Sequence, residues 1–174
     1  MDHFNDQDTL WLFGYGSLIY KADFPYLEKR PASIKNWARR FWQGSHDHRG
    51  TPENPGRVVT LIQESEMICH GMAYRITPDE LRHLDYREKN GYLRCVTEIA
   101  FEGGDSLEGL IYIADHDNAA FLGELPEEAI ARQISRASGP SGSNTDYVIE
   151  LANALRSMNK IDDHVFLIEK YLLE

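Results

Sequence analysis

RRFWQGSHDHRGTPENPGRVVTL, residues 39–61, places two apolar runs on either side of a stretch rich in Gly, Pro and Asn. The pattern predicts strands over Ala38–Gln43 and Val58–Gln63, with an irregular loop over 44–56 between them. Loops of about a dozen residues without regular structure commonly have a function. The segment therefore indicates a β-rich core that carries a functional loop.

The chain outside this segment divides into a strand-rich first two-thirds and a helical last third. Further strands are predicted over Leu10–Phe13, Met67–Ile76, Leu93–Phe101 and Glu108–Ala114. Helices are predicted over Pro126–Ala137, Thr145–Met158 and Asp163–Leu172. Strands followed by helices indicate an α+β architecture, either a small curved sheet or a barrel with helices packed outside. We expect one domain over residues 1–174, with residues 1–9 as a flexible N-terminal extension.

Composition excludes several classes of protein. The net charge of the 174 residues is −10, which disfavours a general role in binding nucleic acid. No apolar run approaches the roughly 20 residues of a membrane span, and the acidic N-terminus is unlike a secretory signal. Cys69 and Cys95 are too few for a disulfide framework, so we expect two separate buried thiols. These features predict a cytoplasmic protein.

Residues 38–62 are locally basic in this acidic chain. The four arginines are Arg39, Arg40, Arg49 and Arg57. Such a segment could guide a small anion to one place, and the alternative is a solvated loop with scattered ion pairs.

The loop also contains His46 and His48 on either side of Asp47. In an extended segment this spacing puts both imidazoles on one side, as metal sites require. Spacing supplies no third ligand, so we predict no metal site. We favour instead a loop braced by hydrogen bonds from Asp47, His48 and Arg49.

A short helix is predicted over Pro78–Lys89. Thr77 is placed as its N-cap and Glu80 follows three residues later, which together form a capping box ahead of an N1 proline. Asn90 and Gly91 provide the stop signal.

Glu88 shares the apolar face of this helix. At about 100° per residue, Leu84 lies about 60° and Glu88 about 20° from Leu81. Burial and the C-terminal end of the helix dipole would both raise the pKa of that carboxyl, which suits general acid–base catalysis. Alternatively, the last turn frays or the carboxylate pairs with a neighbouring basic residue. Asp85, about 40° from Leu81, is a rival catalytic carboxylate or a structural partner for an arginine.

The first strand runs directly into Gly14-Tyr15-Gly16-Ser17. Glycines allow the backbone to adopt positive φ and to approach a ligand closely, and successive amides in such a turn can bind an anion. The pattern matches neither a phosphate-binding loop nor a dinucleotide fingerprint. A simple β-turn is the alternative. Tyr147, one turn into a predicted helix, is expected in the core with its hydroxyl in a cleft.

Taken together, these segments resemble the ChaC-like γ-glutamylcyclotransferases. The segments that carry the resemblance are FGYGSLIY (13–20), the quoted 39–61 segment, LDYREKNGY (84–92), YIADHDN (112–118) and SGPSGSNTDYVIELAN (138–153). They occur in the family's order and cover most of the chain from about residue 10 onward.

The resemblance implies a small mixed β-barrel surrounded by helices, and cleavage of glutathione into 5-oxoproline and cysteinylglycine. It implies that Glu88 is the catalytic glutamate, acting as general base and then as acid. Arg49 or Arg57 is expected to meet the glycine carboxylate of glutathione, and Tyr147 to line the γ-glutamyl pocket. The expected substrate-binding segment consists of Leu12, Phe13, Gly14, Tyr15, Gly16 and Ser17.

This reaction needs no metal, cofactor or enzyme nucleophile, because the substrate's own α-amine attacks its side-chain carbonyl. We expect a small-molecule substrate and no obligate protein partner. Two alternatives remain open at this point. The chain could act on other γ-glutamyl amino acids or amines, or it could be a binding module that senses γ-glutamyl compounds without turnover.

Overall fold

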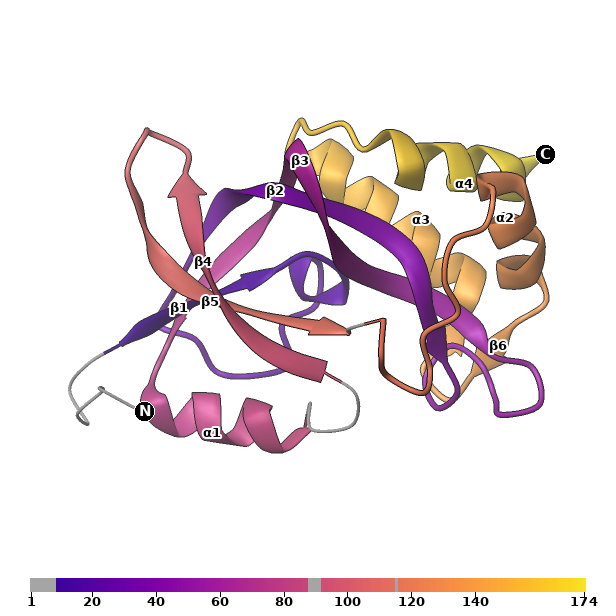
Figure 1. Ribbon diagram of the computed structural model, residues 1–174, viewed down its shortest axis with the longest axis horizontal. Coiled ribbons are helices and arrows are strands. Elements are labelled where there is room, and N and C mark those ends of the chain that lie inside the picture. The colour runs from indigo at the N-terminus through magenta and orange to yellow at the C-terminus, as the bar shows by residue number, and fades with distance from the viewer. Residues whose placement is uncertain (1–8, 88–91, 115) are drawn as a thin grey trace.

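The computed structural model describes residues 9–87, 92–114 and 116–174. Its central element is a closed barrel whose strands neighbour one another in the order β1-β3-β2-β4-β5 (Figure 1). The strands are β1 (Leu10–Gly14), β2 (Glu28–Ser45), β3 (Gly56–Ile76), β4 (Tyr92–Phe101) and β5 (Ser106–Ala114). The predicted α+β class with a small barrel is confirmed.

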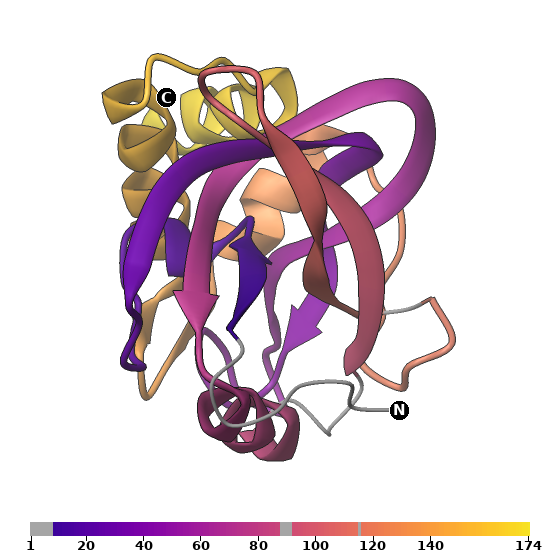
Figure 2. The same ribbon diagram turned by 90° about the vertical axis from the view of Figure 1, so that its left-hand side faces the viewer.

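The barrel is mixed because one of its strand pairs is parallel. β1 pairs antiparallel with β3, β3 with β2, β2 with β4, and β4 with β5. The barrel closes through β1 and β5, which run parallel with Leu12 opposite Leu110. In Figure 2 the strands encircle a common interior, and α1 lies beneath them. The parallel closure brings the ends of β1 and β5 to the same rim of the barrel.

β2 and β3 are long strands of 18 and 21 residues that bend in the middle. The register shifts between Lys35 and Trp37, where Asn36 has a φ of 70° and accepts a hydrogen bond from the Glu66 amide. The two separate strands predicted over Val58–Gln63 and Met67–Ile76 are therefore one strand with a bulge. Its polar residues suggested a break because a bulge exposes side chains that a regular strand would bury.

The prediction for β2 was too short. Only Ala38–Gln43 was predicted, whereas the strand begins at Glu28 and includes Pro31. The charged and proline-containing first half lacks the alternating pattern of a half-buried strand, and its order comes from pairing with β3. A small hairpin of β6 (Ser138–Gly139) and β7 (Gly142–Ser143) was also not predicted.

The described residues form four α-helices, which surround the barrel. They are α1 (Pro78–Arg87), α2 (Glu127–Ser135), α3 (Asn144–Ser157) and α4 (Asp163–Leu173), and a 3₁₀ turn, η1 (Ser17–Ile19), follows β1. Figure 1 shows α1 on one side of the barrel and α2, α3 and α4 grouped on the other. The helical last third of the chain is confirmed. Among the described residues, no helix has the length and apolar character needed to cross a membrane.

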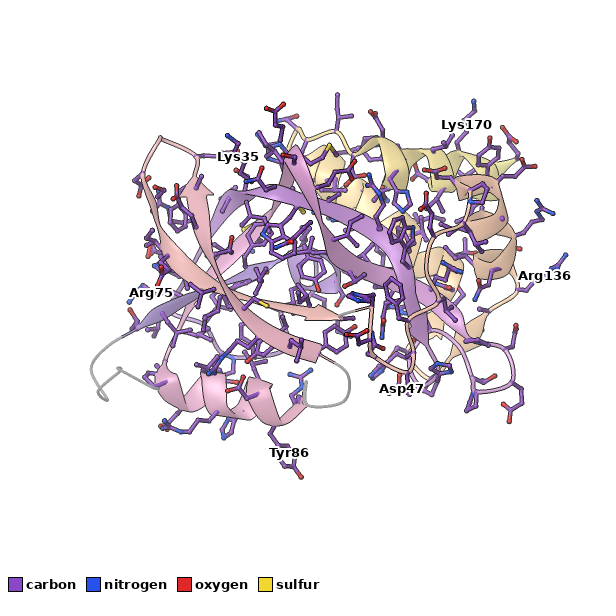
Figure 3. All side chains as sticks on the ribbon, in the orientation of Figure 1. Lys35, Asp47, Arg75, Tyr86, Arg136 and Lys170 are labelled. Atoms are coloured by element: carbon purple, nitrogen blue, oxygen red, sulfur yellow. The ribbon has the colours of Figure 1, made fainter. Side chains whose placement is uncertain are left out.

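Helix α1 has the predicted cap and the predicted buried face. The Glu80 amide donates to Thr77 Oγ1 at 3.3 Å, and Leu81 and Leu84 are buried against the barrel. Tyr86 points away from the barrel (Figure 3) and its exposed fraction is 71%. Residues 88–91, which include the predicted end of the helix, lie outside the described residues.

Hydrophobic residues pack on both faces of the barrel wall. The larger cluster joins the barrel interior, through Phe13 and Ile111, to helices α2–α4, through Ile134 and Leu151. The smaller cluster packs α1 against the outer face of β1 and β3. The rim where β1 ends is thus held between two packed layers.

His164 links β2 to two of the helices. The Phe41 amide donates to His164 Nε2 at 3.0 Å, so the proton of the neutral ring is on Nδ1, which donates to Glu127 Oε1 at 3.2 Å. Burial lowers the pKa of His164 below its ordinary value of 6.5. Protonation of Nε2 would remove the acceptor for the Phe41 amide.

We therefore predict that the folded state loses stability as the pH falls below about 6.5, because the unfolded chain then binds a proton that folded His164 rejects. Urea unfolding midpoints measured at pH 7.5 and pH 5.5 should fall less in His164→Gln than in the wild type. Part of the fall in the urea midpoint between pH 7.5 and pH 5.5 should remain in His164→Gln, since burial also lowers the pKa of His70. An equal loss in both proteins would contradict the role of His164, and His83→Gln, on the exposed face of α1, is the control.

Candidate functional site

The turn after β1 requires glycine for close packing. A Cβ on Gly14 would lie 2.6 Å from the Leu18 Cβ, and one on Gly16 would lie 2.9 Å from both the Tyr147 hydroxyl and the Val59 Cγ2. The φ of Gly16 is −127°, so the expected positive φ is wrong at this position. The glycines allow the turn to lie directly against α3 and β3.

Two backbone amides in this turn are available to a ligand. Within the part of the chain that the structure describes, the amides of Gly16 and Ser17 donate to no protein acceptor, whereas the Gly16 and Ser17 carbonyls accept bonds inside η1. Gly16 is buried and Ser17 is exposed, so the turn reaches the surface at Ser17. Adjacent unpaired amides are suited to a carboxylate or to a developing oxyanion.

Arg39 fixes the orientation of the turn. Its side chain is buried, its Nε donates to the Tyr15 carbonyl at 2.6 Å, and its Nη1 pairs with Asp162 Oδ2 at 2.6 Å. Nη2 donates to the carbonyl of His70. In a trans peptide the N–H points opposite to the C=O, so binding the Tyr15 carbonyl turns the Gly16 amide away from Arg39.

Tyr15 ties the turn to the neighbouring strand. Its hydroxyl donates to the Tyr112 carbonyl on β5 at 2.5 Å. At the same end of β5, Ala114 is paired with Tyr92, the first residue of β4. The turn after β1 and the start of β4 therefore lie at the same rim of the barrel.

Tyr147 comes from α3 to the same turn. It is buried, its ring meets that of Phe41 edge-on at 5.9 Å, and the Val59 amide approaches its hydroxyl at 3.4 Å. Burial raises its pKa to about 12, so the hydroxyl stays protonated near neutral pH. The expectation of a core tyrosine is confirmed, and its hydroxyl lies beside Gly16.

Arg49 lies beside Tyr147. Its guanidinium carbon is 5.6 Å from the Tyr147 ring centroid, its Nη1 donates to the Ser143 carbonyl at 3.1 Å, and its Nη2 is 4.0 Å from Glu150 Oε2. The structure thus brings Arg49, Tyr147 and the turn after β1 together.

Arg57 is placed differently. It is 3% exposed, and its guanidinium donates to Gln133 Oε1 at 2.6 Å and to the carbonyls of Phe41 and Gly123 at 2.9 and 2.8 Å. These bonds connect β3 to α2, to the neighbouring strand β2 and to the segment that contains Gly123. Arg57 is therefore used internally, which argues against its expected contact with a substrate.

Leu12 and Phe13 are each 1% exposed, and their side chains belong to the two different packed layers. Both residues lie within β1 and pair with Tyr74 and Ala73 of β3. They position the turn that follows, and their side chains do not reach its surface.

The structure argues against an anion-guiding role for three of the four arginines of residues 38–62, with Arg49 as the exception. Arg39 and Arg57 are buried on internal acceptors, and Arg40 pairs with Glu64 at 3.3 Å. The predicted bracing of the loop is present at His48 and Arg49, since the Ser141 amide donates to the His48 carbonyl and the Arg49 amide donates to Ser45 Oγ. Asp47 is exposed and only approaches the adjacent His48, at 3.9 Å.

The rival carboxylate, Asp85, already has partners. Arg94 Nη1 and the Tyr112 hydroxyl donate to its two oxygens at 2.5 Å each. The prediction of a structural partner for an arginine is thus confirmed for Asp85. Glu88 lies outside the described residues.

Comparisons with known proteins identify the family of this chain. The family model described as ChaC-like protein matches residues 10–174.

The chain belongs to the ChaC-like family.

Its relatives include proteins whose names state an activity. It is 45% identical to γ-glutamylcyclotransferase 2-3 of Arabidopsis thaliana, over 90% of this chain and 85% of that one. It is 41% identical to glutathione-specific γ-glutamylcyclotransferase 1 of Danio rerio, over 96% and 90%. A selenomethionine-labelled yeast γ-glutamylcyclotransferase specific to glutathione superposes with a TM-score of 0.86 and 32% identity, covering 95% of this chain and 96% of the other.

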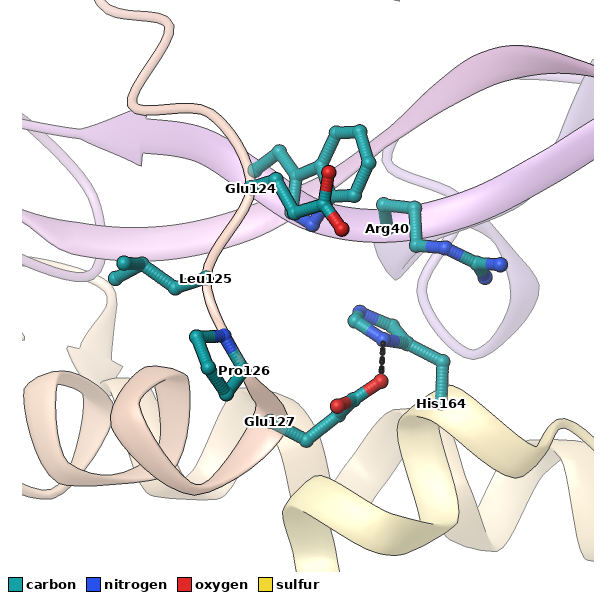
Figure 4. Close-up of a pocket in the computed structure, with 7 residues that line it drawn as sticks. Arg40, Glu124, Leu125, Pro126, Glu127 and His164 are labelled. Carbon is teal, nitrogen blue, oxygen red and sulfur yellow. Dashed lines mark hydrogen bonds and ion pairs between the residues drawn. The ribbon is translucent and has the colours of Figure 1, made fainter.

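Two cavities of this ChaC-like protein lie away from the predicted site residues. One, of about 540 Å³, is bounded by Arg40, Glu124, Glu127 and His164 among others (Figure 4), and a second, of about 330 Å³, adjoins it. Among the described residues, no side chain predicted for the site from the sequence lines either cavity, although Arg39 and Asp162 line the second one. In Figure 4 the Glu127 carboxylate meets the His164 ring, so these groups are engaged with each other.

Arg39 and Asp162 were not identified from the sequence as the residues that hold the turn after β1 in position. Arg39 and its partner Asp162 are 123 positions apart, and ARRF contains two arginines with no local signal that separates the buried Arg39 from the half-buried Arg40. Their contact depends on how α4 packs against β2.

For this ChaC-like protein we predict that Arg39→Met lowers the free energy of unfolding by about 3–5 kcal/mol, since it leaves the partly buried Asp162 carboxylate without its cation. Arg40→Met, one residue along β2, removes an exposed ion pair and should cost only about 0–1 kcal/mol. Urea denaturation of both variants measures the difference. Equal stability of the two would show that Arg39 does not anchor the turn.

Proposed function

We propose that this chain cleaves glutathione by intramolecular cyclisation of its γ-glutamyl group, releasing 5-oxoproline and cysteinylglycine. The observation that carries the proposal is the pair of amides at Gly16 and Ser17, which have no acceptor among the described residues. Arg39 fixes the peptide that contains the Gly16 amide, and Tyr147 and Arg49 lie beside the turn. The names of relatives at 41% and 32% identity over most of their lengths support glutathione as the substrate.

The reaction balances without water or cofactor. The α-amine of the γ-glutamyl group attacks the γ-carbonyl carbon, forming the C–N bond of the five-membered lactam. The amide bond to cysteine breaks, and the proton lost by the attacking amine is passed to the leaving amine. The protein must fold the glutamyl chain back on itself, stabilise the oxyanion and transfer that proton.

Glu88 is our proposed base and acid. A single carboxylate can accept the proton from the attacking nitrogen and return it to the departing one. Its described neighbours in the chain are Arg87, at the end of α1, and Tyr92, at the start of β4 on the rim that carries the turn after β1. Asp85 suits the role less, because Arg94 and the Tyr112 hydroxyl occupy its oxygens.

The remaining groups bind and orient the substrate. We assign the amides of Gly16 and Ser17 to the α-carboxylate or to the oxyanion, and the neighbourhood of Tyr147 to the γ-glutamyl chain. Arg49 provides the cation for the glycine carboxylate. Leu12, Phe13 and Arg57 are assigned supporting positions, because their side chains are buried on internal contacts.

Activity on other γ-glutamyl amino acids or amines is the second candidate function, and the name of the Arabidopsis relative, which does not specify glutathione, favours keeping it. Product release from glutathione, glutathione disulfide and γ-glutamyl-alanine separates these functions. Turnover of glutathione alone supports the first, turnover of all three supports the second, and saturable binding without product indicates a sensing module.

Glu88→Gln should give folded protein that still binds glutathione but releases 5-oxoproline at least about a hundredfold more slowly, since the amide keeps the shape and cannot accept a proton. Turnover is followed by chromatography of 5-oxoproline, and binding by calorimetry. Glu80→Gln, in the first turn of α1, is the matched control and should retain full turnover. Normal turnover by Glu88→Gln would refute the assignment, and a large loss in Asp85→Asn alone would transfer the role to Asp85.

Arg49→Met should raise the KM for glutathione roughly tenfold, as expected for loss of one hydrogen bond to a charged group. The same variant should leave KM unchanged for the glutathione analogue whose glycine carboxylate is an amide, because that analogue lacks the charge that Arg49 meets. An equal rise for both substrates would place Arg49 at another part of the molecule.

A further inference from the structure

Tyr20 is attached to the turn that forms the candidate site. It follows η1, and its amide donates to the Ser17 carbonyl at 3.1 Å, which fixes its backbone relative to the amides of Gly16 and Ser17. Its ring meets that of Tyr147 edge-on, with centroids 6.4 Å apart and an interplanar angle of 76°. Tyr20 therefore lies beside both Tyr147 and the turn after β1.

The hydroxyl of Tyr20 is a buried polar group without a partner. Its oxygen is closed off from solvent and makes no hydrogen bond within the described part of the chain. The hydroxyls of Tyr15 and Tyr74, in contrast, each donate to a backbone carbonyl, of Tyr112 and Leu18 respectively. Most buried side-chain polar atoms in proteins have a partner, and leaving one unpaired is unfavourable for the empty protein.

The surroundings of the hydroxyl indicate which group would satisfy it. The charged or polar groups that act on it are Tyr147, Arg49 and Glu150. Burial raises the pKa of Tyr20, so at neutral pH the oxygen carries its proton and can donate. Together with the free amides of Gly16 and Ser17, the Tyr20 hydroxyl makes this region rich in donors, which fits a ligand that brings acceptors.

We propose that Tyr20 is a substrate-binding residue whose hydroxyl donates a hydrogen bond to the α-carboxylate of the γ-glutamyl group. This inference rests on the proposed function, since it assigns a subsite within the same site. Small adjustments of the surrounding side chains, which are common when ligands bind, open the hydroxyl to the substrate. The bond then exists only in the loaded protein.

Removal of a hydroxyl that gains a partner only when substrate binds should weaken substrate binding without destabilising the empty protein. Tyr20→Phe removes one oxygen atom, so the urea unfolding midpoint of the empty protein should stay the same or rise, while KM for glutathione should increase roughly tenfold. The same increase is expected for γ-glutamyl-alanine, because both substrates carry the γ-glutamyl α-carboxylate. Tyr171→Phe, on α4, is the control for KM, and Tyr74→Phe, which removes a paired hydroxyl, should lower the midpoint.

An unchanged KM for both substrates would overturn the proposal, whatever the effect on stability. A lower midpoint with unchanged KM would show that the hydroxyl has a structural role. If the wild type turns over none of the substrates, the proposed reaction fails, and the Tyr20 assignment is then decided by calorimetric Kd values for γ-glutamyl-alanine in wild type and Tyr20→Phe. Absence of any binding by the wild type would overturn both.

Discussion

The buried guanidinium of Arg39 is the interaction on which the site depends. It joins the Tyr15 carbonyl of the turn, the His70 carbonyl of β3 and the Asp162 carboxylate ahead of α4. Asp162 also caps α4, since its Oδ1 accepts from the Val165 amide. One cation thereby fixes the position of a helix and the orientation of the peptide that presents the Gly16 amide. A charge so far from water is tolerated because each of the three guanidinium nitrogens donates to an acceptor and one of these acceptors is a carboxylate.

This arrangement suits a reaction in which the substrate supplies its own nucleophile. The protein then contributes mainly the orientation of the substrate and fixed hydrogen-bond donors. A rigid turn therefore contributes more to catalysis than a reactive side chain would. Gly14 and Gly16 allow the turn to pack without a gap against Leu18, Val59 and Tyr147. Tyr15 fastens it to β5, so the donors of the turn are fixed before any substrate arrives.

Local patterns in the sequence predicted a good part of this structure. The cap at Thr77, the buried Leu81 and Leu84, and the core position of Tyr147 follow from helix periodicity and side-chain chemistry, and the structure confirms them. The bend at Asn36 and the pairing of Arg39 with Asp162 depend on contacts between distant segments, which no local pattern contains. The internal bonds of Arg57, which argue against its expected contact with a substrate, have the same origin, because local sequence does not tell whether an arginine in a strand faces solvent or buried acceptors.

The central claim is that the γ-glutamyl group closes on itself without taking up water. The most direct test is to incubate the purified protein with glutathione in H₂¹⁸O and analyse the products by mass spectrometry. The account predicts equal amounts of 5-oxoproline and cysteinylglycine, with no ¹⁸O in the 5-oxoproline formed. Release of free glutamate carrying ¹⁸O would show hydrolysis in place of cyclisation and would contradict it.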